Sequence, residues 1–346
     1  MFKKRGSKRP LRFESLERRE LLSVSVKMSA GDLVINDTPS PGGDNDEVAV
    51  FAGGAGVVVA CNNGISNFGG APWITIPWVQ TAKSDLKITM TAGNDAVSIG
   101  DPRALPAPFT APFGGLFGGV IFALNSPFAG MAPPGGATLV QEDVTVKLGK
   151  GDDLLVMNWL GVGRDLNVDT QAAARLNTWA APLSAGPAIG FALADEAILG
   201  FNTFVGRNAT LKTQTGNDVV LVGAAHATNG AITIPGPVPA ILVAFNDPLN
   251  VGDTIGMVVG NKLKINTGAG ADKVFVNFTA ADSLDVQLDK GPDLCSIRGV
   301  TANTKISVAG HSSEKKAAVD TVFGLSNPAA SLNFTPTIST KYAILA

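Results

Sequence analysis

The segment VTVKLGKGDDLLVM, residues 144–157, contains the pattern that decides the fold. Apolar side chains alternate at Val144, Val146 and Leu148, and a Gly-x-Asp turn follows at Gly151 and Asp153. After the turn the pattern predicts that apolar residues alternate again, at Leu155 and Met157. Side chains two positions apart lie on the same face of a β-strand, so each half of the segment predicts a short strand with an apolar face. Gly and Asp between the halves are typical of a tight turn.

The same pattern recurs along most of the chain. Five copies place Asp95, Asp153, Asp218, Asp272 and Asp293 two residues after the turn glycines Gly93, Gly151, Gly216, Gly270 and Gly291. Where copies adjoin, the period is 21 or 22 residues, as between Leu263, Leu284 and Ile306. Weaker copies, with an insertion before the Asp, begin at Leu33, Leu166, Ile232 and Ile306 and continue to Asp46, Asp195, Asp253 and Asp320.

These repeats predict an all-β fold, a parallel β-solenoid of the β-helix type with about nine coils of 21–22 residues. Neither strand of a coil can bury its apolar face alone, but stacked coils share one core, with successive strands about 4.8 Å apart. A β-sandwich has the same alternation and is the alternative fold. The constant Gly-x-Asp offset favours the solenoid.

Insertions rich in Pro, Gly and apolar residues interrupt the repeats at 102–141, 171–194 and 223–249. Loops of this length are usually functional or disordered, and these are too apolar for ordinary disorder. We expect them to lie against the solenoid or to cap it. The alternative is that they form exposed contact surfaces for envelope or extracellular partners, protein or polysaccharide.

Composition argues against several classes of protein. Only 16% of the residues are charged, and residues 1–27 carry nine Lys or Arg against three Glu, so the rest of the chain is acidic and does not suggest nucleic-acid binding. No uninterrupted run of eighteen apolar residues predicts a transmembrane span. Cys61 and Cys295 fit neither a zinc site nor a disulfide framework, and linear stacking would keep them apart as two free thiols.

Two glycine-rich turns, at residues 149–155 and 268–274, resemble the Gly-x-Gly-x-Asp-x-apolar core of the RTX calcium-binding nonapeptide. The resemblance implies that the five Asp residues and their turn glycines form a row of calcium sites, built from carboxylate and main-chain oxygens. RTX coils carry such a turn on both edges, whereas this chain shows it on one. The alternative is that each Asp accepts hydrogen bonds from its own turn backbone.

Residues 13–23, FESLERRELLS, resemble the LEPR-xLL segment of exported and surface proteins of planctomycete-type bacteria. The matching residues are Leu16, Glu17, Arg19, Leu21 and Leu22, while Arg18 stands where that segment has Pro. The resemblance implies export to the cell surface, the envelope or the medium. A short amphipathic basic helix is the alternative. We therefore expect a basic sorting segment at 1–27, disordered or helical, before one repeat domain at 28–346.

These observations together predict a non-enzymatic, structural or adhesive repeat protein of the bacterial envelope or exterior. One alternative is a calcium-dependent, RTX-like exported protein, and calcium is the one cofactor that we consider. A carbohydrate-active β-helix enzyme is the other alternative. Such an enzyme needs carboxylates grouped on a surface groove, whereas Asp152 and Asp153 are adjacent in the chain and would point to opposite faces of a strand, so we expect no catalytic residues.

Overall fold

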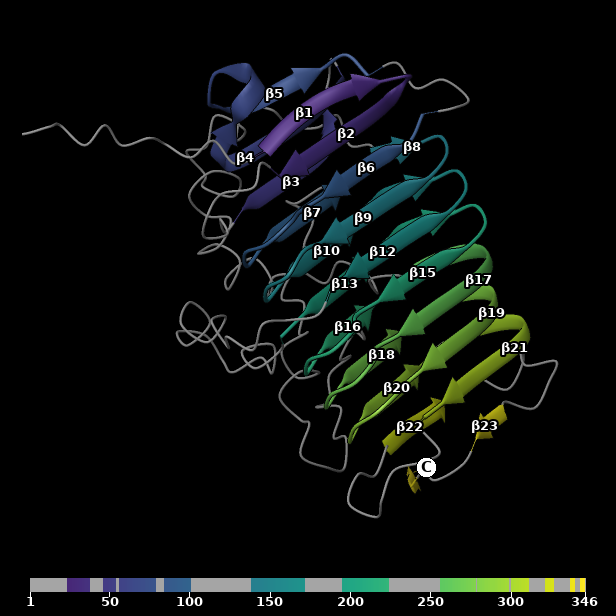
Figure 1. Cartoon of the computed structure of the whole chain (residues 1–346). Helices are drawn as coiled ribbons and strands as arrows, with labels where there is room; N and C mark the ends of the chain where they lie inside the picture. Colours follow the sequence, from purple (N-terminus) through teal and green to yellow (C-terminus); the bar gives the residue numbers. More distant parts are fainter. Residues whose placement is uncertain are drawn as a thin grey trace, which may run out of the picture.

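The computed structural model describes residues 24–37, 46–53, 56–78, 84–100, 138–171, 195–223, 256–277, 279–298, 300–310, 321–326, 337–339 and 343–345. This part of the chain is all-β apart from one short 3-10 helix, η1 (Ser66–Phe68). From residue 86 onward its strands lie one above another in successive layers toward the C-terminal end, and the strands of residues 24–76 lie together at the opposite end (Figure 1). None of its helices is long and apolar enough to span a membrane.

The first ladder contains the strand that precedes each Gly-x-Asp turn. Its members, each parallel to the next, are β2 (Asp32–Asp37), β6 (Leu86–Thr89), β9 (Val144–Leu148), β12 (Leu166–Thr170), β15 (Ala209–Lys212), β17 (Met257–Asn266), β19 (Ala280–Gln287), β21 (Thr301–Ala309) and β23 (Thr337–Ser339). Equivalent residues of successive repeats pair directly, as Val144 does with Leu166 and Leu166 with Ala209.

The second ladder contains the strand that follows each turn. Its members, also parallel, are β3 (Glu47–Gly53), β7 (Ala96–Gly100), β10 (Leu154–Asn158), β13 (Ala197–Phe201), β16 (Val219–Val222), β18 (Lys273–Asn277), β20 (Leu294–Arg298), β22 (Thr321–Ser326) and β24 (Ala343–Leu345). The expected mostly parallel, all-β architecture is therefore confirmed, and it is compatible with a β-solenoid.

A third, shorter ladder runs beside these two. It contains β8 (Thr138–Val140), β11 (Leu160–Val162) and β14 (Thr203–Val205), followed by the first halves of β17, β19 and β21. Because those three long strands belong to the third ladder and then to the first, they join the two around a corner. The insertion expected at 102–141 therefore ends too late, since β8 occupies residues 138–140.

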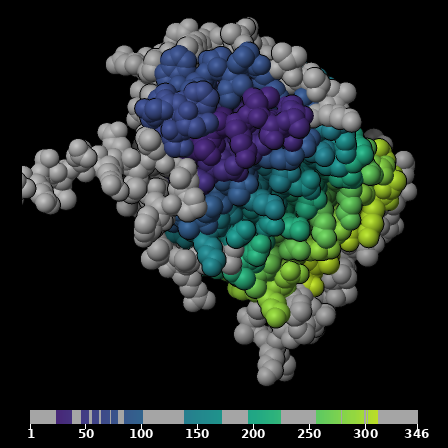
Figure 2. Space-filling view, turned by 45° about the horizontal axis from the view of Figure 1, so that its top comes forward, coloured from purple at the N-terminus to yellow at the C-terminus, as the bar shows by residue number. Residues whose placement is uncertain are grey.

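Antiparallel pairing occurs at the N-terminal end, where β1 (Val24–Ser29) pairs with β2, and β4 (Gly56–Ile65) pairs with β3 and with β5 (Ala71–Ile76). In the space-filling view these purple and blue segments sit at one end of the stack, and the green and yellow repeats follow away from them (Figure 2). Because β1 begins at Val24, residues 24–27, which were expected in the N-terminal segment, are part of this strand.

The core lies between the ladders, and the two kinds of strand bury different amounts of their surface. First-ladder strands alternate: Val144 and Val146 are buried, whereas Thr145 between them is partly exposed. Second-ladder strands are buried on both faces, as the all-buried β10 and β13 show. The expectation that apolar residues alternate after the turn is therefore wrong for these strands. Their near-continuous apolar sequences are typical of strands covered on both sides.

Both ladders contain nine strands in the described residues, as many as the expected repeats. The weak copy starting at Ile232 lies outside these residues; β15 pairs directly with β17, and β23 with β24 forms the ninth layer. Cys61 on β4 and Cys295 on β20 are both buried and are not joined by a disulfide, in agreement with the prediction of two thiols. Burial raises the pKa of the Cys295 thiol to about 12.

Candidate functional site

A row of buried carboxyl groups lies where the second-ladder strands begin. Residues in register across the stack form this acid row: Asp46, Asp95, Asp153, Glu196, Asp218, Asp272 and Asp293. Each is at most 2% exposed, although carboxylates are rarely buried without a partner. The register places the five Asp residues predicted from the sequence in one line. It places Glu196, not Asp195, in the repeat that begins at Leu166.

Hydrogen bonds connect the acid row from one repeat to the next on either side of Glu196, whose own side-chain oxygens accept none. The amide of Asp46 donates to Oδ1 of Asp95 at 3.0 Å, and the amide of Asp95 donates to Oδ1 of Asp153 at 3.0 Å. The amide of Asp218 donates to Oδ1 of Asp272, and that of Asp272 to Oδ1 of Asp293, at 3.0 and 2.9 Å. These carboxyl groups thus accept from the preceding repeat, whereas the sequence suggested acceptance from their own turn.

The glycine before each Asp allows successive turns to touch. A Cβ atom on Gly151 would lie 1.6 Å from the carbonyl oxygen of Gly93, and one on Gly291 would lie 1.3 Å from that of Gly270. The turn carbonyls are used in this contact, since the oxygen of Lys150 accepts the amide of Gly93 at 2.9 Å. Side chains larger than hydrogen would separate the turns.

Electrostatics makes the acid row unusual, because burial disfavours the charged form of a carboxyl group. Burial raises the pKa of Asp153 to about 8, and the nearby Asp95 and Asp152 carboxylates add to the effect. Burial, together with the charges of Asp218 and Asp153, raises the pKa of Glu196 to about 11. The folded protein therefore favours protonated carboxyl groups in the middle of the row.

The acid row supplies some of the oxygen ligands that calcium needs, but few at any one point. Oδ2 of Asp153 and both side-chain oxygens of Glu196 are buried and accept no hydrogen bond. Calcium takes six to eight oxygen ligands. Within the described residues, however, no three His, Cys, Asp or Glu side chains are arranged to hold a metal ion.

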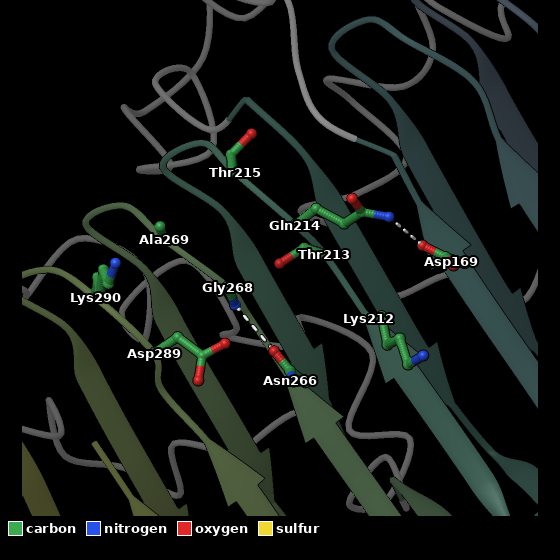
Figure 3. A pocket seen from close by; sticks show the side chains of 10 residues that line it. All are labelled: Asp169, Lys212, Thr213, Gln214, Thr215, Asn266, Gly268, Ala269, Asp289 and Lys290. Atoms are coloured by element: carbon green, nitrogen blue, oxygen red, sulfur yellow. Dashed lines mark hydrogen bonds between the residues drawn. The ribbon is translucent and has the colours of Figure 1, made fainter. Parts of the chain in front are cut away.

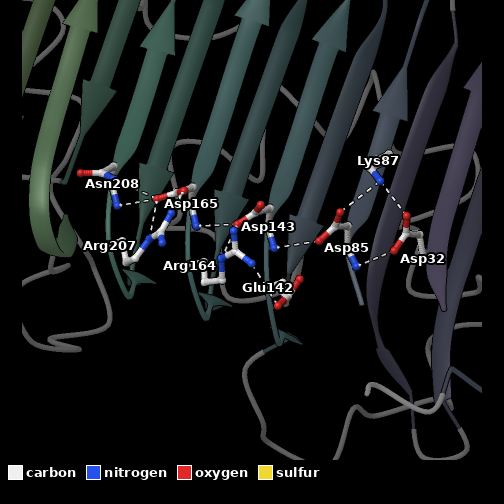
Figure 4. A network of polar contacts seen from close by, with 9 residues as sticks. All are labelled: Asp32, Asp85, Lys87, Glu142, Asp143, Arg164, Asp165, Arg207 and Asn208. Carbon is white, nitrogen blue, oxygen red and sulfur yellow. Dashed lines mark hydrogen bonds and ion pairs between the residues drawn. The ribbon is translucent and has the colours of Figure 1, made fainter. Parts of the chain in front are cut away.

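A second row of Asp side chains, the corner row, was not predicted from the sequence. It occupies the corner where the first-ladder strands begin (Figure 4). The amide of Asp85 donates to Oδ1 of Asp32 at 3.1 Å. In the same way the amide of Asp143 donates to Asp85, that of Asp165 to Asp143, and that of Asn208 to Asp165. The signal was present in the sequence, because an Asp directly precedes the first apolar residue of β2, β6, β9 and β12.

Cations balance the charges of this corner row. Lys87 bridges Asp32 and Asp85 at 2.6 and 3.0 Å, Arg164 pairs with Glu142, and Arg207 pairs with Asp165. The hydrogen bond from Arg207 lowers the pKa of Asp165. Solvent-exposed ion pairs such as these contribute little to stability, so their main effect is to hold the corner side chains in register.

A polar groove of about 630 Å³ lies beside the Gly-x-Asp turns, on the outer side of the first ladder (Figure 3). Side chains from the ends of β12, β15, β17 and β19 line it, among them Asp169, Lys212, Gln214, Asn266, Asp289 and Lys290. Nε2 of Gln214 donates to Oδ1 of Asp169 in the neighbouring repeat at 2.9 Å. The groove was not predicted from the sequence, because it depends on which turns lie next to one another.

Comparison with protein-family models, with curated proteins and with solved structures found no significant match. The segment that resembles LEPR-xLL, with Leu16, Glu17, Arg19, Leu21 and Leu22, lies outside the described residues. So do Asp253, Asp320 and the insertions, apart from their boundary residues and β8.

Proposed function

We propose that the chain is an exported β-solenoid, and that its stack serves as a structural or adhesive element of the bacterial envelope or exterior. The observation that carries this proposal is the continuous register of the first two ladders, nine strands each, around one core. At about 4.8 Å per strand such a stack is about 40 Å long. An element of this kind suits a spacer that carries contact surfaces at set intervals.

Two features support rigidity. Asp side chains join neighbouring repeats at both corners, as Asp153 does with Asp95 at one corner and Asp143 with Asp165 at the other, so these turns are tied as well as the strands. The core is a single cluster that runs from Val24 to Val308, so no repeat is separated from its neighbours by a polar layer. In such repeat architectures each unit is stabilised mainly by the units next to it.

Export rests on the basic N-terminal segment and its resemblance to LEPR-xLL. The test is fractionation of the source cells, with the full-length protein traced by antibody. We expect it in the envelope, surface or medium fraction. Replacing Leu21 and Leu22 by Asp should retain it in the cytoplasm, whereas Leu11→Asp, outside the motif, should not. Recovery of the unaltered protein from the cytoplasm alone would refute the proposal.

A second candidate function is calcium-dependent folding, and the buried oxygens of Asp153 and Glu196 that accept no hydrogen bond favour it. Bound calcium would offset the repulsion between stacked carboxylates, which is about 1 kcal/mol per pair in water and larger in the interior. Melting temperatures of the full chain with calcium and with chelator test this candidate. A rise with calcium that Asp153→Asn abolishes would support it, and identical melting curves would exclude it.

A further inference from the structure

The polar groove has the size and position of a binding site. Its volume of about 630 Å³ falls within the range of about 300–1,000 Å³ that ligand pockets occupy. It crosses the ends of successive first-ladder strands, where Asp169 pairs in register with Lys212 and Lys212 with Asn266. A ligand lying along the stack would therefore meet one polar side chain per strand, about every 4.8 Å.

The charges in the groove indicate what kind of ligand it fits. Two carboxylates, Asp169 and Asp289, and two ammonium groups, Lys212 and Lys290, line it together. Lys212, Asp289 and Lys290 form no ion pair with any residue that the structure describes. Such a balanced set favours neither a strongly anionic nor a strongly cationic ligand. Hydroxyl groups suit it, because a hydroxyl donates to a carboxylate and accepts from an ammonium group.

The lining also argues against a peptide ligand. Peptides bound in an extended form usually add to a free strand edge or place apolar side chains in pockets. The strands beside this groove are paired on both sides, and among its lining residues only Ala269 has an apolar side chain. A linear sugar chain needs neither feature. Its rise per residue is close to the strand spacing, so consecutive sugars would face equivalent positions of consecutive repeats.

We propose that the groove binds a linear, uncharged oligosaccharide lying along the stack, with Lys212 and Asp289 as its principal hydrogen-bonding partners. This proposal rests on the adhesive function proposed above and names the class of ligand. The groove is open and has no aromatic residue in its lining, so a single site binds weakly, with a Kd of about 1 mM.

Calorimetric titration of the purified full-length protein tests the proposal with three probes of different charge: cellohexaose, oligogalacturonate and chitosan hexamer. We expect cellohexaose to bind more tightly than either charged probe. Lys212→Ala and Asp289→Ala should each weaken its binding at least about tenfold. Lys264→Ala is the matched control, since Lys264 faces outward on β17, two residues before Asn266, and does not line the groove; it should leave binding unchanged.

Three outcomes would overturn the proposal: no binding of cellohexaose at millimolar concentration, tighter binding of a charged probe, or equal weakening by the control variant. The result is independent of the proposed function as a whole. Surface location without binding would reject the oligosaccharide alone. Binding by a protein confined to the cytoplasm would reject export and leave the groove assignment in place.

Discussion

At the residue scale, the Gly-x-Asp turn combines close contact with a hydrogen-bond acceptor. The glycine lets neighbouring turns approach to main-chain contact, and the Asp side chain accepts the amide that opens the equivalent strand of the repeat before it. That amide lies just before the strand, where the ladder has not yet begun. Without the carboxyl group it would be a buried donor lacking a partner, which costs about 1–3 kcal/mol.

Replacing one turn glycine tests the contact directly. Gly151→Ala would place a Cβ atom 1.6 Å from a main-chain oxygen, so two turns must separate, and we expect a loss of about 3 kcal/mol in the free energy of unfolding. Gly69→Ala is the control: its φ of 67° strains alanine, but nothing lies within 4 Å of the new atom, so the cost should be about 1 kcal/mol. Equal losses in urea denaturation would contradict the close-contact account.

The buried carboxyl groups predict an unusual pH dependence of stability. Because the pKa of Asp153 rises to about 8 and that of Glu196 to about 11, the folded protein keeps protons that the unfolded chain releases at about pH 4. Their stabilising effect is complete below about pH 4 and is lost as the pH rises through the folded-state values. In chelator, the melting temperature should fall from about pH 5 to about pH 9.

Asp153→Asn should remove part of that fall, since an amide cannot ionise but its oxygen can still accept the Asp95 amide. The change in unfolding free energy between the two pH values should shrink by a few kcal/mol, because each unit by which the pKa is raised corresponds to about 1.4 kcal/mol. Thr210→Ser, on the outer face of β15, is the control: it changes no ionisable group and should leave the slope as it is. An unaltered slope in Asp153→Asn would show that this side chain does not hold a proton.

At the element scale, the two strands of each repeat differ in what covers them. The outer face of the first ladder is polar, whereas the outer face of the second is apolar and buried, as Val156, Leu199, Leu221 and Phe275 show in register. Leu199→Ser should therefore destabilise the protein by about 3 kcal/mol, like a core truncation. Thr210→Ser, on the outer face of β15, should cost less than about 0.5 kcal/mol, and similar losses in thermal unfolding would contradict two-sided burial.

Sequence periodicity predicted the elements well where one face is polar. Polar residues such as Thr145 and Lys147, placed between apolar ones, identify β9 as a half-exposed strand from the sequence alone. The continuous apolar sequences of β10 and β13 indicate burial on both faces, although they were interpreted as alternation. Glu196 was missed because an insertion replaces the Gly-x-Asp turn of its repeat, and its place in the acid row follows only from strand register.

At the scale of the whole molecule, the register of the ladders determines which side chains meet in the acid row and in the groove. A repeat period predicts stacking, but it does not predict which repeats touch when insertions of different length separate them. The pairing of β15 with β17 across residues 213–256 is an example, and it also forms the groove. In the acid row, Asp46 and Asp95 are 49 residues apart in the chain, and Asp95 and Asp153 are 58 apart. The constant offset from the turn glycine predicted one row, but which members form hydrogen bonds follows only from the strand register.

Disulfide cross-linking between repeats tests this register most directly. In a Cys61→Ser, Cys295→Ala background, Asn167→Cys and Thr210→Cys occupy paired outward positions on β12 and β15, about 4.8 Å apart, within disulfide reach. Asn167→Cys with Lys264→Cys spans two repeats, about 10 Å, and is out of reach. The stacked, parallel register predicts rapid oxidation of the first pair and none of the second. Failure of the first pair, or equal cross-linking of both, would contradict it.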